Sequence, residues 1–213
     1  MALPADDRRS RLVHRARVLS VLSIMWTTLE AVLGTAAALA AGSVALLGFG
    51  LDSLIEMASA GTILWLYTGT RNGADRAERR AQQVVALCFG ALALYLLFDG
   101  VRTLADGRHP GTTWLGAAVA VGAIVIMPLL ARAKGRIAAQ LGSSATAGDA
   151  MQSWLCAVIA ATALASLLAN AALGWWWLDP IAGLAIAGVA AREGREAWRG
   201  DTCADCAPVG FDA

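Results

Sequence analysis

Two acidic side chains lie inside one of the most apolar stretches of the chain, in the segment GFGLDSLIEMAS at residues 48–59. Asp52 and Glu56 are four residues apart, so both carboxylates share one face if the segment is helical. A charge exposed to lipid is costly, so an acid at membrane depth normally faces the interior of a helix bundle or an aqueous cavity. The spacing therefore predicts two inward-facing carboxylates near the middle of a membrane-spanning helix.

Two other apolar stretches carry polar residues at helical spacing. Residues 148–169 contain a stripe at i, i+3, i+4 and i+7, formed by Asp149, Gln152, Ser153 and Cys156. Residues 18–40 contain a second stripe, formed by Ser23, Thr27 and Glu30. Carboxylates, an amide oxygen and a thiol can together bind a divalent cation, and the mixture of carboxylate and sulfur suits zinc better than magnesium.

These stripes predict a metal site at the membrane midplane. Its predicted ligands are Asp52, Glu56, Gln152 and Cys156. Asp149 lies nearer the end of its stretch, and we assign it to the same metal site as a residue that guides the ion inward. Two residues are predicted to serve as auxiliary ligands or in proton coupling, namely Glu30 and Ser153.

Each of these residues also has a simpler interpretation. The acid pair could form a proton relay without metal. A Gln or Ser in a membrane span commonly forms hydrogen bonds between helices. Cys156 by itself is typical of a small apolar core residue. The joint pattern on three helices favours the metal site.

The helices that must position these residues are evident from the composition. The 213 residues are 58% hydrophobic and 15% charged, whereas a soluble domain is about half apolar and about a quarter charged. The apolar stretches lie at roughly 18–40, 43–67, 82–104, 113–131, 148–169 and 175–191. Most are long enough to cross a hydrocarbon core of about 30 Å. The fold class predicted is therefore an all-α integral membrane protein whose six transmembrane helices form one domain at residues 18–191.

The basic residues predict the orientation. All Lys and Arg residues except Arg102 and Arg108 fall in the N-terminal segment 1–17 or in segments that one face of the membrane would share. The segment ARAKGR, which contains Lys134, is among them and is interpreted as a cytoplasmic link. The positive-inside rule then places both termini in the cytoplasm, and we expect the plasma membrane as the location.

Three smaller features complete the predictions. The cytoplasmic tail, residues 192–213, contains Cys203 and Cys206 in a CxxC pattern that could capture metal, although one such pair supplies only two ligands. Asp179 precedes a proline and is expected to cap the N-terminus of the last helix. Small residues four apart fit either the bundle or a dimer interface, namely Gly116 with Ala120 and Gly183 with Ala187.

The second apolar stretch resembles the second span of the cation diffusion facilitators, which carries an acid or histidine, three spacers and an acid. Here this motif reads Asp52-x-x-x-Glu56. The family's partner motif on span five is commonly Ala-Asp-x-x-His-x-x-x-Asp. The segment GDAMQSWLC matches the leading Asp149 but has Gln152 and Cys156 where the His and second Asp would fall.

The resemblance covers roughly residues 18–200, and only the motif of the second span is specific. It is closest to a small branch that includes a vertebrate vesicular zinc-transport protein. Most members also carry a soluble C-terminal metal-sensing domain, which we expect to be lacking here. The resemblance implies six spans, cytoplasmic termini, exchange of metal against protons, and a homodimer.

The predicted function is a secondary transporter that exports a divalent metal, zinc, from the cytoplasm in exchange for protons. Its partners are the metal ion, protons and the lipid bilayer, with no tightly bound cofactor and no nucleic acid. No phosphate-binding glycine loop or catalytic triad indicates an enzyme. Two alternatives stay open, a proton-coupled transporter of a small solute and a non-transporting metal sensor or partner subunit.

Overall fold

The computed structural model describes residues 5–68 and 75–199, and most of these residues lie in helices. The helices are α1 (Ala5–Ala41), α2 (Val44–Tyr67), α3 (Asp75–Asp106), α4 (Trp114–Leu141), α5 (Ser144–Leu173) and α6 (Leu178–Arg199). Most are longer than the apolar stretches that predict them, because polar terminal turns continue the helices beyond the apolar part. Cys203 and Cys206 lie outside the described residues.

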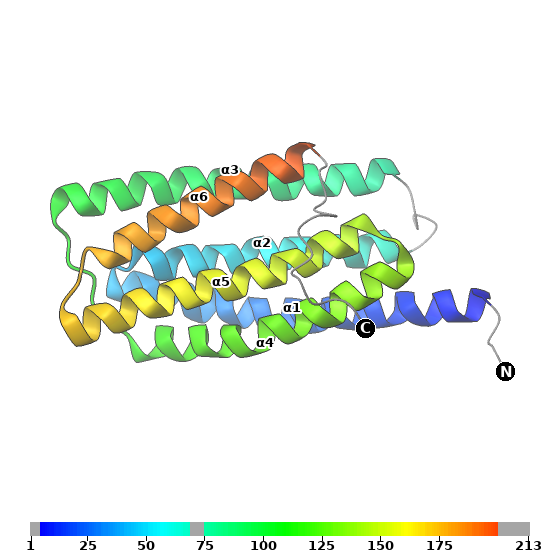
Figure 1. The fold of residues 1–213 in the computed structure, drawn as a ribbon, viewed down its shortest axis with the longest axis horizontal. Coiled ribbons are helices and arrows are strands. Elements are labelled where there is room, and N and C mark those ends of the chain that lie inside the picture. The colour runs from blue at the N-terminus through cyan, green and yellow to red at the C-terminus, as the bar shows by residue number, and fades with distance from the viewer. Residues whose placement is uncertain (1–4, 69–74, 200–213) are drawn as a thin grey trace.

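The helices run alternately up and down in three layers (Figure 1). Helices α3 and α6 pack together in one outer layer, α2 and α5 form the middle layer, and α1 and α4 form the other outer layer. Helix α2 is the central one. In its most apolar 18-residue segment 72% of the residues are buried, against 33–39% in the corresponding segments of α1, α3, α4 and α5. The helix that carries the acid pair is therefore the one most shielded from lipid.

Five of the described helices, α1 to α5, are long and apolar enough to cross a membrane. Helix α6 is not apolar enough over its length to count among these candidate spans, although it packs along α3 within the bundle. Its first half is apolar, but its second half, REGREAWR, is highly charged and lowers the mean hydropathy. The all-α membrane fold is thus confirmed, whereas the domain boundaries at residues 18 and 191 stay predictions.

Two similar turns join the helices that carry the polar stripes. Gly42 ends α1 and Gly142 ends α4, both with left-handed backbones of φ 65° and 62°, which glycine adopts without a Cβ penalty. Ser43 and Ser143 follow them, and each side chain accepts a backbone N–H in the first turn of the next helix. The hairpins α1–α2 and α4–α5 are therefore built alike, and their turns lie at opposite ends of the bundle (Figure 1).

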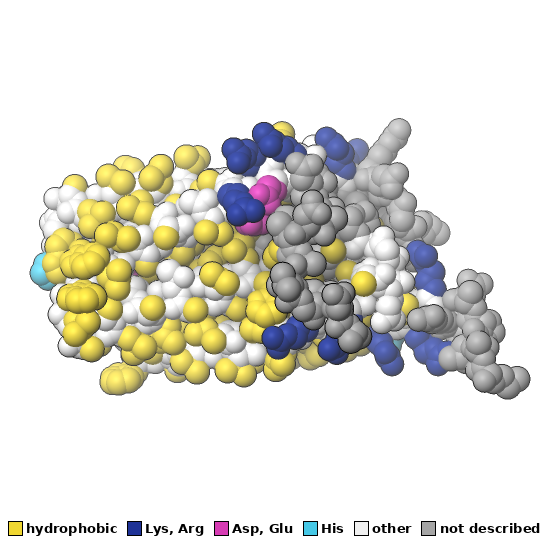
Figure 2. Space-filling model, viewed as in Figure 1, with side chains coloured by type: hydrophobic (Ala, Val, Ile, Leu, Met, Phe, Trp, Pro, Cys, Tyr) yellow, Lys and Arg dark blue, Asp and Glu magenta, His cyan; other side chains and the backbone are white. Residues whose placement is uncertain are grey.

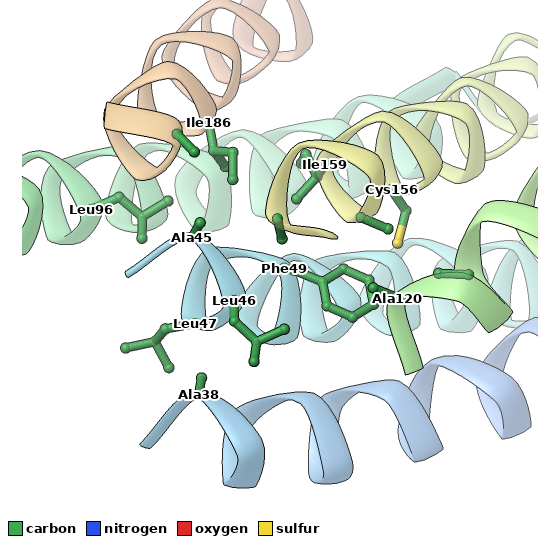
Figure 3. Packing of buried hydrophobic residues seen from close by; sticks show 14 of the residues in the cluster. Ala38, Ala45, Leu46, Leu47, Phe49, Leu96, Ala120, Cys156, Ile159 and Ile186 are labelled. Carbon is green, nitrogen blue, oxygen red and sulfur yellow. The ribbon is translucent and has the colours of Figure 1, made fainter. Parts of the chain in front are cut away.

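The apolar core draws on every helix, and small residues allow close approach to α2. Figure 3 shows core side chains from α1 to α6, including Ala38, Leu46, Phe49, Leu96, Ala120, Ile159 and Ile186. A Cβ added at Gly116 would lie 2.4 Å from Leu46 Cδ2, and one at Gly183 would lie 2.6 Å from Val44 Cγ1. Both small-residue pairs accordingly serve packing inside the bundle.

The surface matches a membrane environment. In Figure 2, hydrophobic side chains cover much of the visible face, and Lys and Arg side chains gather toward one end. Helix α1 begins at that end and α6 runs toward it from the opposite end (Figure 1). The segregation of basic residues is therefore visible in three dimensions. Which side of the membrane this end occupies stays a prediction.

Candidate functional site

The polar stripes of α2 and α5 meet in the middle layer of the bundle. Asp52 and Glu56 are 0% exposed, and Cys156 is also fully buried. The Gln152 side chain donates its Nε2–H to Asp52 Oδ1 at 3.2 Å, so the two predicted ligand pairs face each other directly. The expectation that these side chains point into the bundle is confirmed.

Each α2 carboxylate has one satisfied oxygen and one unsatisfied oxygen. Ser153 donates its hydroxyl to Glu56 Oε1 at 2.5 Å, and Gln152 holds the first oxygen of Asp52. Within the part of the chain that the structure describes, Asp52 Oδ2 and Glu56 Oε2 are buried without a hydrogen-bond partner. Buried polar groups are normally paired, so these two carboxylate oxygens, one helical turn apart, are the ones best placed to accept a proton or a cation.

Glu30 brings a third carboxylate to this centre from α1. It accepts hydrogen bonds from Trp26 Nε1–H and, at 3.3 Å, from the Ser53 hydroxyl. The Cys156 sulfur lies 4.0 Å from Glu30 Oε2 and interacts electrostatically with the other two carboxylates. Glu30 thus lies at the acidic centre, where Trp26 and Ser53 orient its side chain, while its role as an auxiliary ligand or in proton coupling stays a prediction.

The rest of the α1 stripe does not reach this centre through side-chain hydrogen bonds. The Thr27 hydroxyl donates to the backbone oxygen of Ser23 at 2.8 Å, which is a bond within its own helix. We therefore assign these two residues to the packing of α1.

Sequence reasoning missed one residue, Lys134 of α4. Its ammonium lies 3.0 Å from Asp149 Oδ2 and 3.6 Å from Glu56 Oε1, and it donates to the Ser153 hydroxyl at 2.9 Å. Only 2% of the side chain is exposed. The prediction that the segment around Lys134 forms a link between helices is wrong, because α4 continues through it to Leu141, while the side of the membrane at which the segment lies stays a prediction.

A signal for this burial exists in the sequence. Lys134 lies seven residues after Met127 and three after Ala131, and all three belong to the same buried face of α4. Arg132 and Arg136 fall between the buried positions. The three basic residues together are typical of a solvated segment. The helical spacing of the buried positions, however, distinguishes Lys134 from Arg132 and Arg136.

Asp149 is buried and fully engaged. Besides the Lys134 ammonium, it accepts a hydrogen bond from the Ser59 hydroxyl of α2 at 3.1 Å. It also interacts electrostatically with Glu56. Its carboxylate therefore links α2, α4 and α5 beside the acidic centre, while its predicted role in guiding ions stays a prediction.

Asp179 has a different role from the one its sequence context predicts. It lies inside the first turn of α6, and its carboxylate accepts hydrogen bonds from Ser43 Oγ at 2.5 Å, Val44 N–H at 2.7 Å and Ala45 N–H at 3.4 Å. The expected cap of its own helix is therefore wrong. Asp179 caps α2, and a negative charge at a helix N-terminus is favourable because of the helix dipole.

The centre is strongly acidic in balance. Within the described residues, it contains four buried carboxylates (Glu30, Asp52, Glu56 and Asp149), which repel one another, and a single buried ammonium, which contacts only Glu56 and Asp149 among them. Among residues 5–68 and 75–199, no three His, Cys, Asp or Glu side chains are grouped closely enough to hold a metal ion in this arrangement. A cation that bound here would draw the orphaned oxygens inward and relieve their mutual repulsion.

The chain matches a known family over most of its length. A family model described as the cation efflux transmembrane domain matches residues 20–199, which include all six helices except the first turns of α1. No curated protein matches the sequence. The family match agrees with the buried acidic centre in a helical membrane bundle, and the chain therefore belongs to the cation efflux family of membrane transporters.

Proposed function

We propose that this protein moves a divalent metal cation, zinc, out of the cytoplasm in exchange for protons. The observation that supports the proposal is the pair of orphaned oxygens, Asp52 Oδ2 and Glu56 Oε2, buried one turn apart on the most shielded helix. Burying a carboxylate without a close counter-charge is costly, and the ammonium of Lys134 approaches Glu56 only to 3.6 Å. A divalent cation between the two carboxylates would offset that cost for both at once.

The choice of zinc rests on the chemistry of the donors. Asp52 and Glu56 offer hard oxygen ligands, whereas the Cys156 sulfur is soft, and zinc accepts both kinds. Gln152 presents its amide N–H to Asp52 in this structure. To become a ligand it would turn its carbonyl oxygen inward, because an amide nitrogen has no lone pair to offer.

Exchange with protons follows from the same donors. Carboxylates and a thiol bind metal only in their deprotonated forms, so protons and metal compete for one set of atoms. When the centre faces the cytoplasm it would bind metal, and when it faces the opposite side protons would displace the metal. Rocking of one group of helices against another would expose the centre to each side in turn.

Three further proposals accompany this function. The protein would act as a homodimer in the plasma membrane with both termini in the cytoplasm. Glu30 would accept protons or complete the metal shell, since it shares the centre with Cys156. Cys203 and Cys206 would capture metal before delivery.

The experiment is zinc flux into proteoliposomes under an imposed pH gradient, with purified full-length protein. Asp52→Asn keeps the size of the side chain and removes its charge, so flux should fall to the background of empty liposomes. Asp106→Asn is the matched control, because Asp106 is half-exposed and far from the centre along α3. Equal flux in wild type and Asp52→Asn would remove Asp52 from the site.

The same assay separates the two alternatives. Zinc binding without flux would identify a metal sensor or partner subunit. Proton flux that a small solute drives and chelators leave unchanged would identify a solute transporter that uses the acids as a relay.

A further inference from the structure

A positive charge already occupies the acidic centre. Among the described residues, Lys134 is the one Lys or Arg whose side chain is buried with these acids. Its ammonium lies between two carboxylates, one from α2 and one from α5, at 3.6 Å and 3.0 Å. The Ser153 hydroxyl lies 2.9 Å from the ammonium and 2.5 Å from Glu56.

The two carboxylates that Lys134 contacts differ in their other partners. Asp149 has both oxygens engaged, one by Ser59 and one by the ammonium at the shorter distance. Glu56 keeps Oε2 without a partner and holds the ammonium only loosely. The contact with Glu56 is therefore the weaker of the two, and it is the one that can break while Asp149 still neutralises the ammonium.

A metal ion bound by Glu56 would lie close to the ammonium. Two cations within a few ångströms of each other repel strongly in a medium of low dielectric constant. The flexible four-carbon stem of a lysine allows its head group to move without a change in the backbone. A shift of the ammonium toward Asp149 would relieve the repulsion and free Glu56 for the metal.

We infer that Lys134 is the resident counter-cation of the transport site. It neutralises Glu56 when the site holds no metal and withdraws onto Asp149 when metal binds. Lys134 therefore competes with the transported ion by charge, lowers the affinity of the site and speeds release of the metal. This inference rests on the proposed function and adds the residue that sets the affinity of the site.

The test is equilibrium zinc binding to the purified full-length chain, with calorimetry as the readout and the amount of folded protein measured by gel filtration. Lys134→Gln removes the competing charge and keeps a polar head group for Ser153. Its zinc dissociation constant should fall by about tenfold or more relative to wild type. Lys134→Arg keeps the charge and should bind zinc like wild type. An ammonium that served only to stabilise the fold would give Lys134→Gln the same or a weaker affinity, and that result overturns the inference.

A second variant covers the case in which Lys134→Gln does not fold. Lys134→Gln/Asp149→Asn removes one positive and one negative charge together, so no carboxylate is left in excess relative to wild type. The same tightening is expected, with Asp149→Asn as its control. If neither neutral variant folds, Lys134 serves the fold and the inference is wrong.

The outcomes also separate this inference from the proposed function. Absence of zinc binding in wild type and in every variant would overturn the proposed function and the inference with it. Zinc binding in wild type that disappears in Asp52→Asn but is unchanged in Lys134→Gln would leave the function standing and overturn the inference alone.

Discussion

The hairpins α1–α2 and α4–α5 share one architecture but differ in the chemistry of their buried side chains. Each consists of a long helix, a Gly-Ser turn and a second helix with a buried polar face. Asp52 and Glu56 on α2 are four residues apart, as are Gln152 and Cys156 on α5. Gln152 donates a hydrogen bond to Asp52, which lies 100 residues earlier in the sequence. The first hairpin supplies three carboxylates, whereas the second supplies one carboxylate (Asp149), an amide, a thiol and the ammonium of Lys134.

This difference shows what each half contributes. The two carboxylate oxygens without a hydrogen-bond partner, Asp52 Oδ2 and Glu56 Oε2, both lie on the first hairpin. The second hairpin supplies donors that satisfy the other oxygen of each acid, through Gln152 and Ser153. The two hairpins thus share the geometry of their turns, and the buried side chains make the first hairpin the more acidic of the two.

The two turns also differ in their hydrogen bonds, because Asp179 of α6 accepts bonds at the start of α2. This difference leads to the prediction with the largest effect on stability. Asp179→Ala would leave the Ser43 hydroxyl and the Val44 N–H without their acceptor at the start of α2. We expect a loss of about 3 kcal/mol in the free energy of unfolding, because charge-assisted bonds at a buried helix end are costly to lose. Thermal unfolding in detergent would measure it.

Ser143→Ala is the matched change in the second hairpin. Ser143 caps α5 with its own side chain, so this variant should lose only about 1 kcal/mol. Equal losses in the two variants would show that Asp179 contributes no more to the cap of α2 than a serine side chain does to the cap of α5, and no loss in Asp179→Ala would show that it contributes nothing.

The ligand difference between the hairpins leads to the next prediction. Cys156→Asp replaces the soft donor with a carboxylate and makes the second hairpin more like the first. The ratio of zinc to manganese transport should fall by about tenfold, because manganese prefers oxygen ligands. Flux of both metals in proteoliposomes would measure this ratio. Cys156→Ser is the control for the loss of sulfur without added charge, and an unchanged ratio in Cys156→Asp would assign Cys156 to packing.

The smallest effect concerns the turn that the hairpins share. Gly142→Ala places a Cβ where nothing lies within 4 Å, so the only cost is the left-handed backbone at φ 62°. We expect about 1 kcal/mol of lost stability and unchanged zinc flux at saturation. Gly42→Ala meets the same open space at φ 65° and should behave alike. A marked loss of flux in either variant would mean that the turn takes part in transport.

The sequence by itself determined the features that depend on local order. Apolar length and helical period gave the class of fold, and the spacing of Asp52 with Glu56 and of Gln152 with Cys156 put each pair on one face. These conclusions need only the geometry of a single helix. The family motif on α2 was equally local, and the match over residues 20–199 confirmed the family that it indicates.

Only the tertiary structure decided which faces meet. In the folded chain Lys134 is buried beside two of the acids, and Asp179 caps α2 rather than α6. Gly116 and Gly183 lie where α4 and α6 pack closely against α2. From sequence alone, a charged residue near a helix end is predicted to face solvent. Only its neighbours on the other helices show whether it is buried. The partners of Lys134 are 15 and 78 positions away in the sequence, and such long-range contacts arise only when packing fixes the rotation of each helix about its axis.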